Sequence, residues 1–569
     1  MPIPQHLRRS AVLVLAASLL AAAAPEAPAP NPPPRPNRYQ TSGAFGAFMD
    51  GRFAASQGEL DIAAAAFLRA LEGDPRNVDL IQPAFIATLL AGRPEAPHLA
   101  RRLPDVPMAQ LLIANQEIKA GNWDAAEQRV RAAPRQGGQP AQVLLAAWAQ
   151  QGAGRTDAAL ATLRPLLDNA RTRTLGALHS ALINDLAARH AEAQRLYRIM
   201  QADTGGANLR LGQMIASWQV RQGQLAEAGA TLRALLENGE DLPLAVSSLL
   251  AAAAQRPVAR PTDGAAEVYF SLASLVAGQR EGSEMAPQLL RLALDLRPDF
   301  TQARLLLAEV LEAGKNWTTA LIILAPVAAD DPLSGVVRLR RATLLDRAGR
   351  TDDALRDLDQ LARDFPDSPL AYAQAGDILR VKSRFGEAVT SYDRAIARMT
   401  APKQGAWSLY YTRGIAQDRS GAWPKAERDF QRALELMPDH PYILNYLGYA
   451  WADQGRNLTK ARALLERAME RKPNDGAITD SMGWVLFRQG DAPGAIRLLE
   501  RAAELQPTDA VINLHLGDAY WAAGRKREAN FQWQRALLLN PEPDDKVKLE
   551  AKLRENGAAL DAAPERIVQ

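Results

Sequence analysis

The chain has 569 residues, of which 47% are apolar, only 6% are aromatic and none is cysteine. The absence of cysteine excludes disulfides, thiolate metal sites, a cysteine nucleophile and a lipid-modified N-terminal cysteine. The 67 basic and 64 acidic residues leave a formal net charge of +3, so no bulk positive field is present to attract a nucleic acid.

Residues 1–23 are predicted to be a signal peptide. Basic residues precede an apolar run from Ala11 to Ala24, and the alanines near its end offer a small-residue cleavage site. Because this run is shorter than the roughly 20 apolar residues that span a bilayer, we expect cleavage near Ala23 rather than retention as an anchor. The mature protein would then be periplasmic or secreted, with peripheral attachment to the envelope as an option.

Residues 24–40 are predicted to be a proline-rich linker. The segment PEAPAPNPPPRP at 25–36 contains seven prolines, and a run of this composition is extended and solvated. It acts as a spacer between the signal peptide and the remainder of the chain.

Residues 41–255 are predicted to be irregular N-terminal helical repeats. The first unit carries Gly51, Ala63 and Phe67 in columns that recur near the C-terminus, whereas prolines interrupt the pattern that follows. Several later segments still show an apolar-periodic helix, a glycine-containing turn and a second such helix. The stretch RPVARPTDG at 256–264 is predicted to join this irregular half to a regular one.

Residues 265–541 are predicted to form a regular array, because prolines recur along them every 34 to 36 residues. A fixed period of this size indicates a repeat protein. The segment 542–569 is predicted to be a capping helix, which covers the last exposed face of such an array, followed by a tail. The repeating prolines are Pro298, Pro332, Pro366, Pro402, Pro438, Pro473, Pro507 and Pro541.

Within the regular units, small and large apolar residues keep fixed columns. Gly483 and Ala495 share their columns with Gly517 and Ala529, and we expect these small residues to let two helices approach closely. A proline then ends the second helix, and an aspartate stands where the next helix needs an N-cap. The expected N-caps are Asp439, Asp475 and Asp509.

This arrangement of glycine, alanine, large apolar and proline columns over 34 residues resembles the tetratricopeptide repeat (TPR) family. The resemblance implies an all-α solenoid of helix-turn-helix repeats that forms a right-handed superhelix. It also implies an inner, concave face lined mainly by the first helix of each repeat. The low aromatic content and the many alanines agree with helices packed through small side chains.

No catalytic or metal-binding motif stands out in the sequence. The six histidines form no HExxH or other close metal-ligand pair, and there is no P-loop, no GxGxxG that follows a strand and no GxSxG elbow. We therefore expect no metal, no cofactor and no enzymatic activity. An enzymatic site hidden in residues 78–255 is the alternative.

Positions that face the inner surface follow from helical steps taken along the first helices from the glycine column. They mix aromatic rings with single charges, which suits recognition of a protein or peptide partner. The alternative is that Trp484 and Trp521 pack between adjacent helices and that binding takes place in the irregular half. The nine positions, named the inner row, are Tyr411, Asp418, Asn445, Tyr449, Asp480, Trp484, Arg488, Asp518 and Trp521.

The last three repeats contain NYLGYAWADQG, DSMGWVLFRQG and HLGDAYWAAGRKREA. They resemble the C-terminal region of large bacterial envelope TPR proteins, among them adaptors that deliver peptidoglycan hydrolases to a periplasmic C-terminal-processing protease. The resemblance implies an exported, non-catalytic binding scaffold, with that protease and its substrates as partners. The alternative is an assembly factor for an envelope secretion or polysaccharide-export machine.

Overall fold

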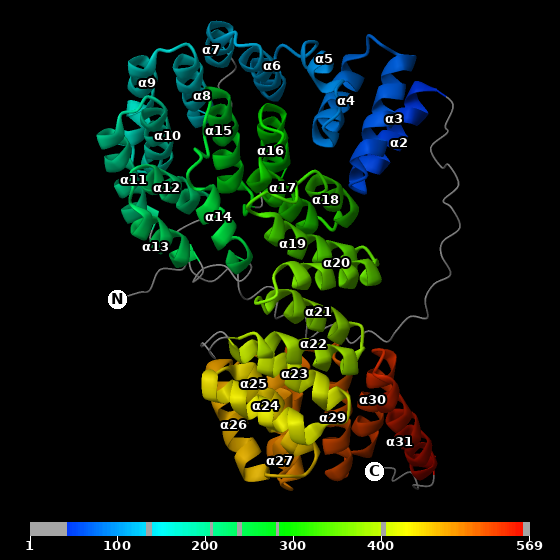
Figure 1. Cartoon of the computed structure of the whole chain (residues 1–569). Coiled ribbons are helices and arrows are strands. Elements are labelled where there is room, and N and C mark those ends of the chain that lie inside the picture. Colours follow the sequence, from blue (N-terminus) through cyan, green and yellow to red (C-terminus); the bar gives the residue numbers. More distant parts are fainter. Residues whose placement is uncertain are drawn as a thin grey trace. The chain divides into compact units, whose positions relative to one another are not determined.

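The computed structural model describes residues 43–132, 139–204, 209–235, 242–279, 284–399 and 406–561. Every regular element in these ranges is a helix, and neighbouring helices pack against each other in pairs (Figure 1). The predicted all-α repeat class is therefore confirmed. The predicted signal peptide and proline-rich linker lie outside the described residues. No helix within the described ranges is both long enough and apolar enough to cross a membrane.

The described chain forms two compact units, which are divided between Ala371 and Tyr372. The helices of the first unit are α2 (Ala44–Ser56), α3 (Leu60–Gly73), α4 (Val78–Ala91), α5 (Ala96–Ala100), α6 (Pro107–Lys119), α7 (Trp123–Ala132), α8 (Gln139–Gly152), α9 (Thr156–Asp168), α10 (Arg173–Leu186), α11 (His190–Thr204), α12 (Leu209–Arg221), α13 (Leu225–Leu235), the 3-10 helix η1 (Leu242–Leu244), α14 (Val246–Ala252), α15 (Pro261–Val276), α16 (Met285–Leu296), α17 (Thr301–Ala313), α18 (Trp317–Leu324), α19 (Ser334–Arg347) and α20 (Thr351–Asp364).

Helix α21 (Leu370–Val381) begins at the division, and the remaining helices belong to the second unit. They are α22 (Phe385–Ala397), α23 (Trp407–Arg419), α24 (Trp423–Leu436), α25 (Pro441–Asp453), α26 (Leu458–Arg471), α27 (Gly476–Arg488), α28 (Ala492–Leu505), α29 (Ala510–Ala522), α30 (Lys526–Leu538) and α31 (Pro543–Asp561).

In the first unit, α15 and α16 pack against the helices that precede them by a long stretch of chain. Helix α15 contacts α8 and α10, and α16 contacts α4 and α6, so that the two lie along the inner side of the arc of earlier pairs (Figure 1). The close approach of α15 to α8 depends on Gly264, because a β-carbon there would lie 2.3 Å from the ring of Trp148. The inner face of the irregular half is thus filled by the chain itself.

Buried polar contacts fix these two helices in place. Arg210 of α12 forms an ion pair of 2.7 Å with Glu267 of α15, and the two side chains are 7% and 0% exposed. Tyr269 donates its hydroxyl proton to Asn115 Oδ1 at 2.9 Å, and Asn115 Nδ2 donates to the carbonyl oxygen of Leu292 at 3.0 Å. A buried charge is costly unless it is paired, so the Arg210–Glu267 contact strongly favours this one arrangement of α12 and α15.

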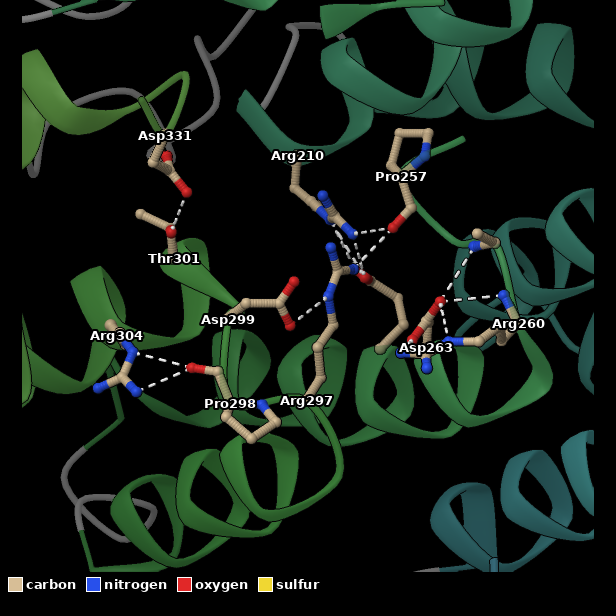
Figure 2. A network of polar contacts seen from close by, with 12 residues as sticks. Arg210, Pro257, Arg260, Asp263, Arg297, Pro298, Asp299, Thr301, Arg304 and Asp331 are labelled. Carbon is tan, nitrogen blue, oxygen red and sulfur yellow. Dashed lines mark hydrogen bonds and ion pairs between the residues drawn. The ribbon is translucent and has the colours of Figure 1, made fainter. Parts of the chain in front are cut away.

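The segment 256–264, expected to be a joint, lies inside the first unit and is held on both sides (Figure 2). The carbonyl oxygen of Pro257 accepts hydrogen bonds from Arg210 at 3.4 Å and from Arg297 at 2.7 Å. At the start of α15, an Asp263 carboxylate oxygen accepts from the backbone N–H of Arg260 at 2.9 Å. The two compact units divide after Ala371, and α15 and α16 pack onto the helix pairs that precede them.

The glycine column makes room for a large side chain of the second helix in each pair. A β-carbon at Gly483 would lie 2.7 Å from Cγ of Leu499, and one at Gly517 would lie 2.5 Å from Cδ1 of Trp533. The atoms nearest to these two glycines belong to residues that follow the expected Ala495 and Ala529, whereas at Gly448 the carbonyl oxygen of Ala461, in the same alanine column, lies 3.2 Å from such a β-carbon. Each large side chain follows its alanine by one helical turn on the same face, and the glycine leaves the space that this side chain fills.

Two of the three expected N-caps are confirmed. The Asp475 carboxylate accepts from the N–H of Ile478, and the Asp509 carboxylate accepts from two N–H groups at the start of α29. Asp439 is not a cap, because it lies one residue nearer to its proline and pairs with Arg467 and Arg471 instead. A proline at the first position of α25 supplies the start signal there.

Gly483→Leu is expected to lower the free energy of unfolding by about 1–3 kcal/mol, because the added side chain overpacks the contact with Leu499. Thermal and denaturant unfolding followed by circular dichroism measure this change. Ala463→Leu on the exposed face of α26 is the matched control and should change stability little. Equal shifts in the two variants would contradict the helix pairing described above.

Candidate partner-binding face

The inner row lies on four successive first helices of the second unit, α23, α25, α27 and α29. Helix α25 packs against α27, and α27 packs against α29. Helical steps from the glycine column therefore select residues that lie on successive first helices of this unit. Their burial differs greatly, and this difference decides which of them a partner can reach.

The centre of the inner row is packed rather than open. Asp480 and Trp484 are only 4% and 7% exposed. His515, a residue outside the inner row, pairs through Nδ1 with an Asp480 carboxylate oxygen at 2.9 Å. Its ring stacks on that of Trp484, with ring centres 4.0 Å apart and an angle of 14° between the planes. For Trp484 the packing alternative therefore describes the structure better than a free anchor does.

Tyr411 and Tyr449 are also packed against neighbouring side chains. Tyr411 is 4% exposed and contacts Phe430 of α24 with ring centres 6.0 Å apart. The ring of Tyr449 lies 5.9 Å from that of His515. Burial raises the pKa of both phenol groups above the usual value, so the two side chains stay neutral at ordinary pH.

Asp418 and Asp518 have partners within the second unit. The Tyr446 hydroxyl donates to Asp418 at 2.9 Å, and burial raises the pKa of the Asp418 carboxyl. Asp518 accepts a hydrogen bond from Trp533 Nε1 at 2.9 Å and forms an ion pair of 2.9 Å with Lys552. Because these contacts already use both carboxylates, neither is a free charge that waits for a ligand.

Arg488 and Trp521 remain accessible. Arg488 is exposed, and its guanidinium donates to the backbone carbonyl of Asp453 at 2.9 Å. The ring of Trp521 is half-buried, with its centre 5.4 Å from that of Trp533. Asn445 is half-buried as well, and its Oδ1 is a buried acceptor without a hydrogen-bond partner. A partner would therefore meet a closely packed face that offers one aromatic ring and one cation, whereas the unused acceptor of Asn445 lies beneath the surface.

The sequence did not predict that α31 and the residue before it form ion pairs with the first helices of this unit. Glu542, directly before α31, forms an ion pair of 2.9 Å with Arg419 at the end of α23, and Lys552 of α31 pairs with Asp518. The segment 542–569 was expected to act only as a cap. The 34-residue period that relates Asp518 to Lys552 could have revealed the second contact, whereas nothing in the sequence signals the first.

The irregular half does not offer an open inner surface in the described part of the chain, because α15 and α16 pack there. Its buried histidine, His179, accepts a hydrogen bond through Nδ1 from Trp148 Nε1 at 3.0 Å. Burial lowers the pKa of His179 to about 3, which keeps the imidazole neutral and able to accept. Within the described ranges, no group of three or more histidine, aspartate or glutamate side chains is arranged to hold a metal ion.

His515 gives the second unit a pH-dependent stability. Burial disfavours the imidazolium form, but the negative charge of Asp480 and its hydrogen bond outweigh burial and raise the pKa of His515. The folded protein then binds this proton more tightly than the unfolded chain does. The contribution to stability is complete below the unfolded pKa of about 6.5 and is lost as the pH rises through the folded pKa.

Asp480→Asn is expected to lower the free energy of unfolding by about 3 kcal/mol near pH 6, because it leaves the buried histidine without its charge partner. It should also flatten the decline of stability with rising pH. Denaturant unfolding of both proteins over a series of pH values measures the two effects. Asp439→Asn, which removes an exposed carboxylate, should keep the wild-type slope. Parallel pH profiles for wild type and Asp480→Asn would contradict this role of His515.

Comparison with known proteins identifies the repeat type. Residues 339–402 and 411–476 match one tetratricopeptide repeat family model, and residues 486–553 match a second. The matched residues are therefore tetratricopeptide repeats, and they contain the whole inner row except Asp480 and Trp484. Extended concave surfaces of repeat proteins of this class are used for binding.

Two relatives are similar to part of the chain. A TPR repeat-containing protein of Pseudomonas aeruginosa is 31% identical over 166 residues, which are 28% of this chain and 27% of that protein. Mouse aspartyl/asparaginyl beta-hydroxylase is 27% identical over 205 residues, which are 34% of this chain and 27% of that protein. The chain thus spans about a quarter of the length of either relative. Among solved structures, yeast Tom70 has a TM-score of 0.34 at 14% identity, with 81% of this chain and 97% of that chain covered.

Proposed function

We propose that this chain is a non-catalytic scaffold that binds a protein or peptide partner on the inner row. The matched tetratricopeptide repeats are the premise, and the accessibility of Arg488 and Trp521 beside packed neighbours is the observation that supports this site. Binding anchors are often a few aromatic or arginine side chains held by a well-packed surrounding. Because packing already fixes most side chains of the inner row, little conformational freedom is lost when a partner binds.

The proposal includes export. A basic start followed by a short apolar run and alanines supports cleavage near Ala23, which would release a periplasmic or secreted protein. N-terminal sequencing of the protein recovered from the envelope fraction tests this step, and we expect the mature protein to begin near residue 24. A mature protein that still carries Met1 and the apolar run would contradict it.

The adaptor role is the more specific form of the proposal. It is supported by the resemblance of the last three repeats to envelope adaptors of a periplasmic C-terminal-processing protease that acts on wall hydrolases. Mass spectrometry of proteins that co-purify from envelope extract tests it. Recovery of a protease together with wall hydrolases is expected, whereas recovery of a secretion or export complex would replace the adaptor by an assembly factor. Catalytic activity of the purified chain alone would contradict a non-catalytic scaffold.

Trp521→Ala is expected to weaken binding of the co-purified partner by about 2 kcal/mol or more, with a smaller loss of stability than Trp484→Ala, because part of its ring is accessible. Arg488→Glu should weaken binding chiefly through charge, so the loss should shrink at high salt. Isothermal titration calorimetry at low and high salt measures both effects.

Trp484→Ala serves as the control for packing. Its indole is buried against His515, so the truncation should lower the free energy of unfolding by about 3–5 kcal/mol. It should affect binding only through the loss of folded protein. Unchanged affinity in folded Trp521→Ala and Arg488→Glu proteins would remove the inner row as the binding site.

A further inference from the structure

Helix α2 carries a stripe of large apolar residues at its surface. Phe45, Met49 and Phe53 are 77%, 48% and 57% exposed. Their spacing of four residues places them on one face of the helix. Phe48, in contrast, packs against Phe67 of α3 with ring centres 5.8 Å apart. The three exposed residues, named the α2 stripe, therefore lie largely outside the contact between α2 and α3.

Two of the three columns are buried in later repeats, whereas the column of Phe45 holds the exposed Ala477 in α27. Counted from the glycine column, Phe53 corresponds to Val485, which is 0% exposed. Met49 corresponds to His515, which stacks on Trp484 of the preceding first helix. In that repeat, the column of Met49 packs against the repeat before it. The α2 stripe is thus a repeat-to-repeat packing face that no earlier repeat covers within the described residues.

The sequence before α2 offers no apolar helix to cover this face after removal of the signal peptide, a step that rests on the proposed export. Residues 25–36 contain seven prolines, which prevent a helix. A contiguous apolar stripe on a soluble surface usually marks an interaction site.

The α2 stripe is complementary to itself. Its residues are evenly spaced about Met49, so two antiparallel α2 helices related by a two-fold axis at Met49 place Phe45 of each copy against Phe53 of the other. The helix contains one acidic and one basic residue, Asp50 and Arg52, so no net charge repels a second copy. Antiparallel packing also sets the two helix dipoles in the favourable direction.

We propose that α2 is a self-association face through which two copies of this chain form a symmetric dimer. Each copy contributes the same three apolar residues, and the dimer covers on both copies the packing face that the first repeat leaves open. One helix pair buries less surface than the roughly 1,600 Å² of a standard interface. The dimer is therefore reversible and depends on protein concentration.

Single cysteines test the symmetry, because the chain has none of its own. Met49→Cys lies at the two-fold axis, where the two Cβ atoms can come within the roughly 4 Å that a disulfide needs, so mild oxidation should yield a crosslinked dimer. Phe45→Cys and Phe53→Cys should each stay uncrosslinked alone and should crosslink when mixed. Ala463→Cys, on the exposed face of α26, is the control and should stay monomeric. Equal crosslinking of all single variants, or none in any mixture, would overturn the proposal.

Sedimentation velocity over a wide range of concentration tests the association itself, with the full-length chain and the chain lacking residues 1–23. The shortened chain should dimerise, and Met49→Glu should raise its dimer dissociation constant by at least about tenfold, because it places two like charges at the axis. At a concentration where both proteins are monomeric, its melting temperature should equal that of the unsubstituted chain, since Met49 is at the surface. Ala463→Glu should leave the dimer intact.

A shortened chain that remains monomeric at every concentration, or a dimer that survives Met49→Glu, would overturn the self-association face. N-terminal sequencing reports the fate of the signal peptide separately, so a failure of export is distinguishable from a failure of the dimer.

Discussion

The contact between a first-helix glycine and a large side chain of the following helix sets the geometry of the regular helix pairs. Gly517 receives the indole of Trp533, and Gly51, near the other end of the array, receives the ring of Phe67. Protein interiors are close-packed, so a larger residue in the glycine column would force the two helices apart. The inner row depends on this contact, because its residues stand on the same first helices and take their spacing from it.

The two units use the inner side of their first helices in different ways. In the first unit, α15 and α16 fill that side, and the Arg210–Glu267 pair stabilises the arrangement only while both charges stay together. In the second unit, polar and aromatic contacts such as His515–Asp480 pack the side chains of the inner row and still leave Arg488 accessible. When later helices of a solenoid pack onto the inner side of earlier repeats, that side becomes part of the core and is no longer open to a partner.

The sequence predicts contacts that recur with the repeat and fails for those that do not. Its period located the helix pairs, and the position of aspartate after proline explains why Asp475 is a cap and Asp439 is not. The packing of α15 onto α8 could not be predicted, because no period relates residues so far apart in the chain. The inner row was found by helical steps, but its burial depends on His515, whose side chain adds a contact specific to one repeat.

The packing of α15 and α16 also has a mechanical consequence. In a stack in which each repeat contacts only its neighbours, a pulling force can unfold the repeats one after another, and the chain then lengthens in small steps. In the first unit, the hydrogen bond from Asn115 to Leu292 joins residues 177 positions apart, so a load applied to its ends is shared by the whole unit. That unit should resist stretching up to a threshold and then give way in one large extension.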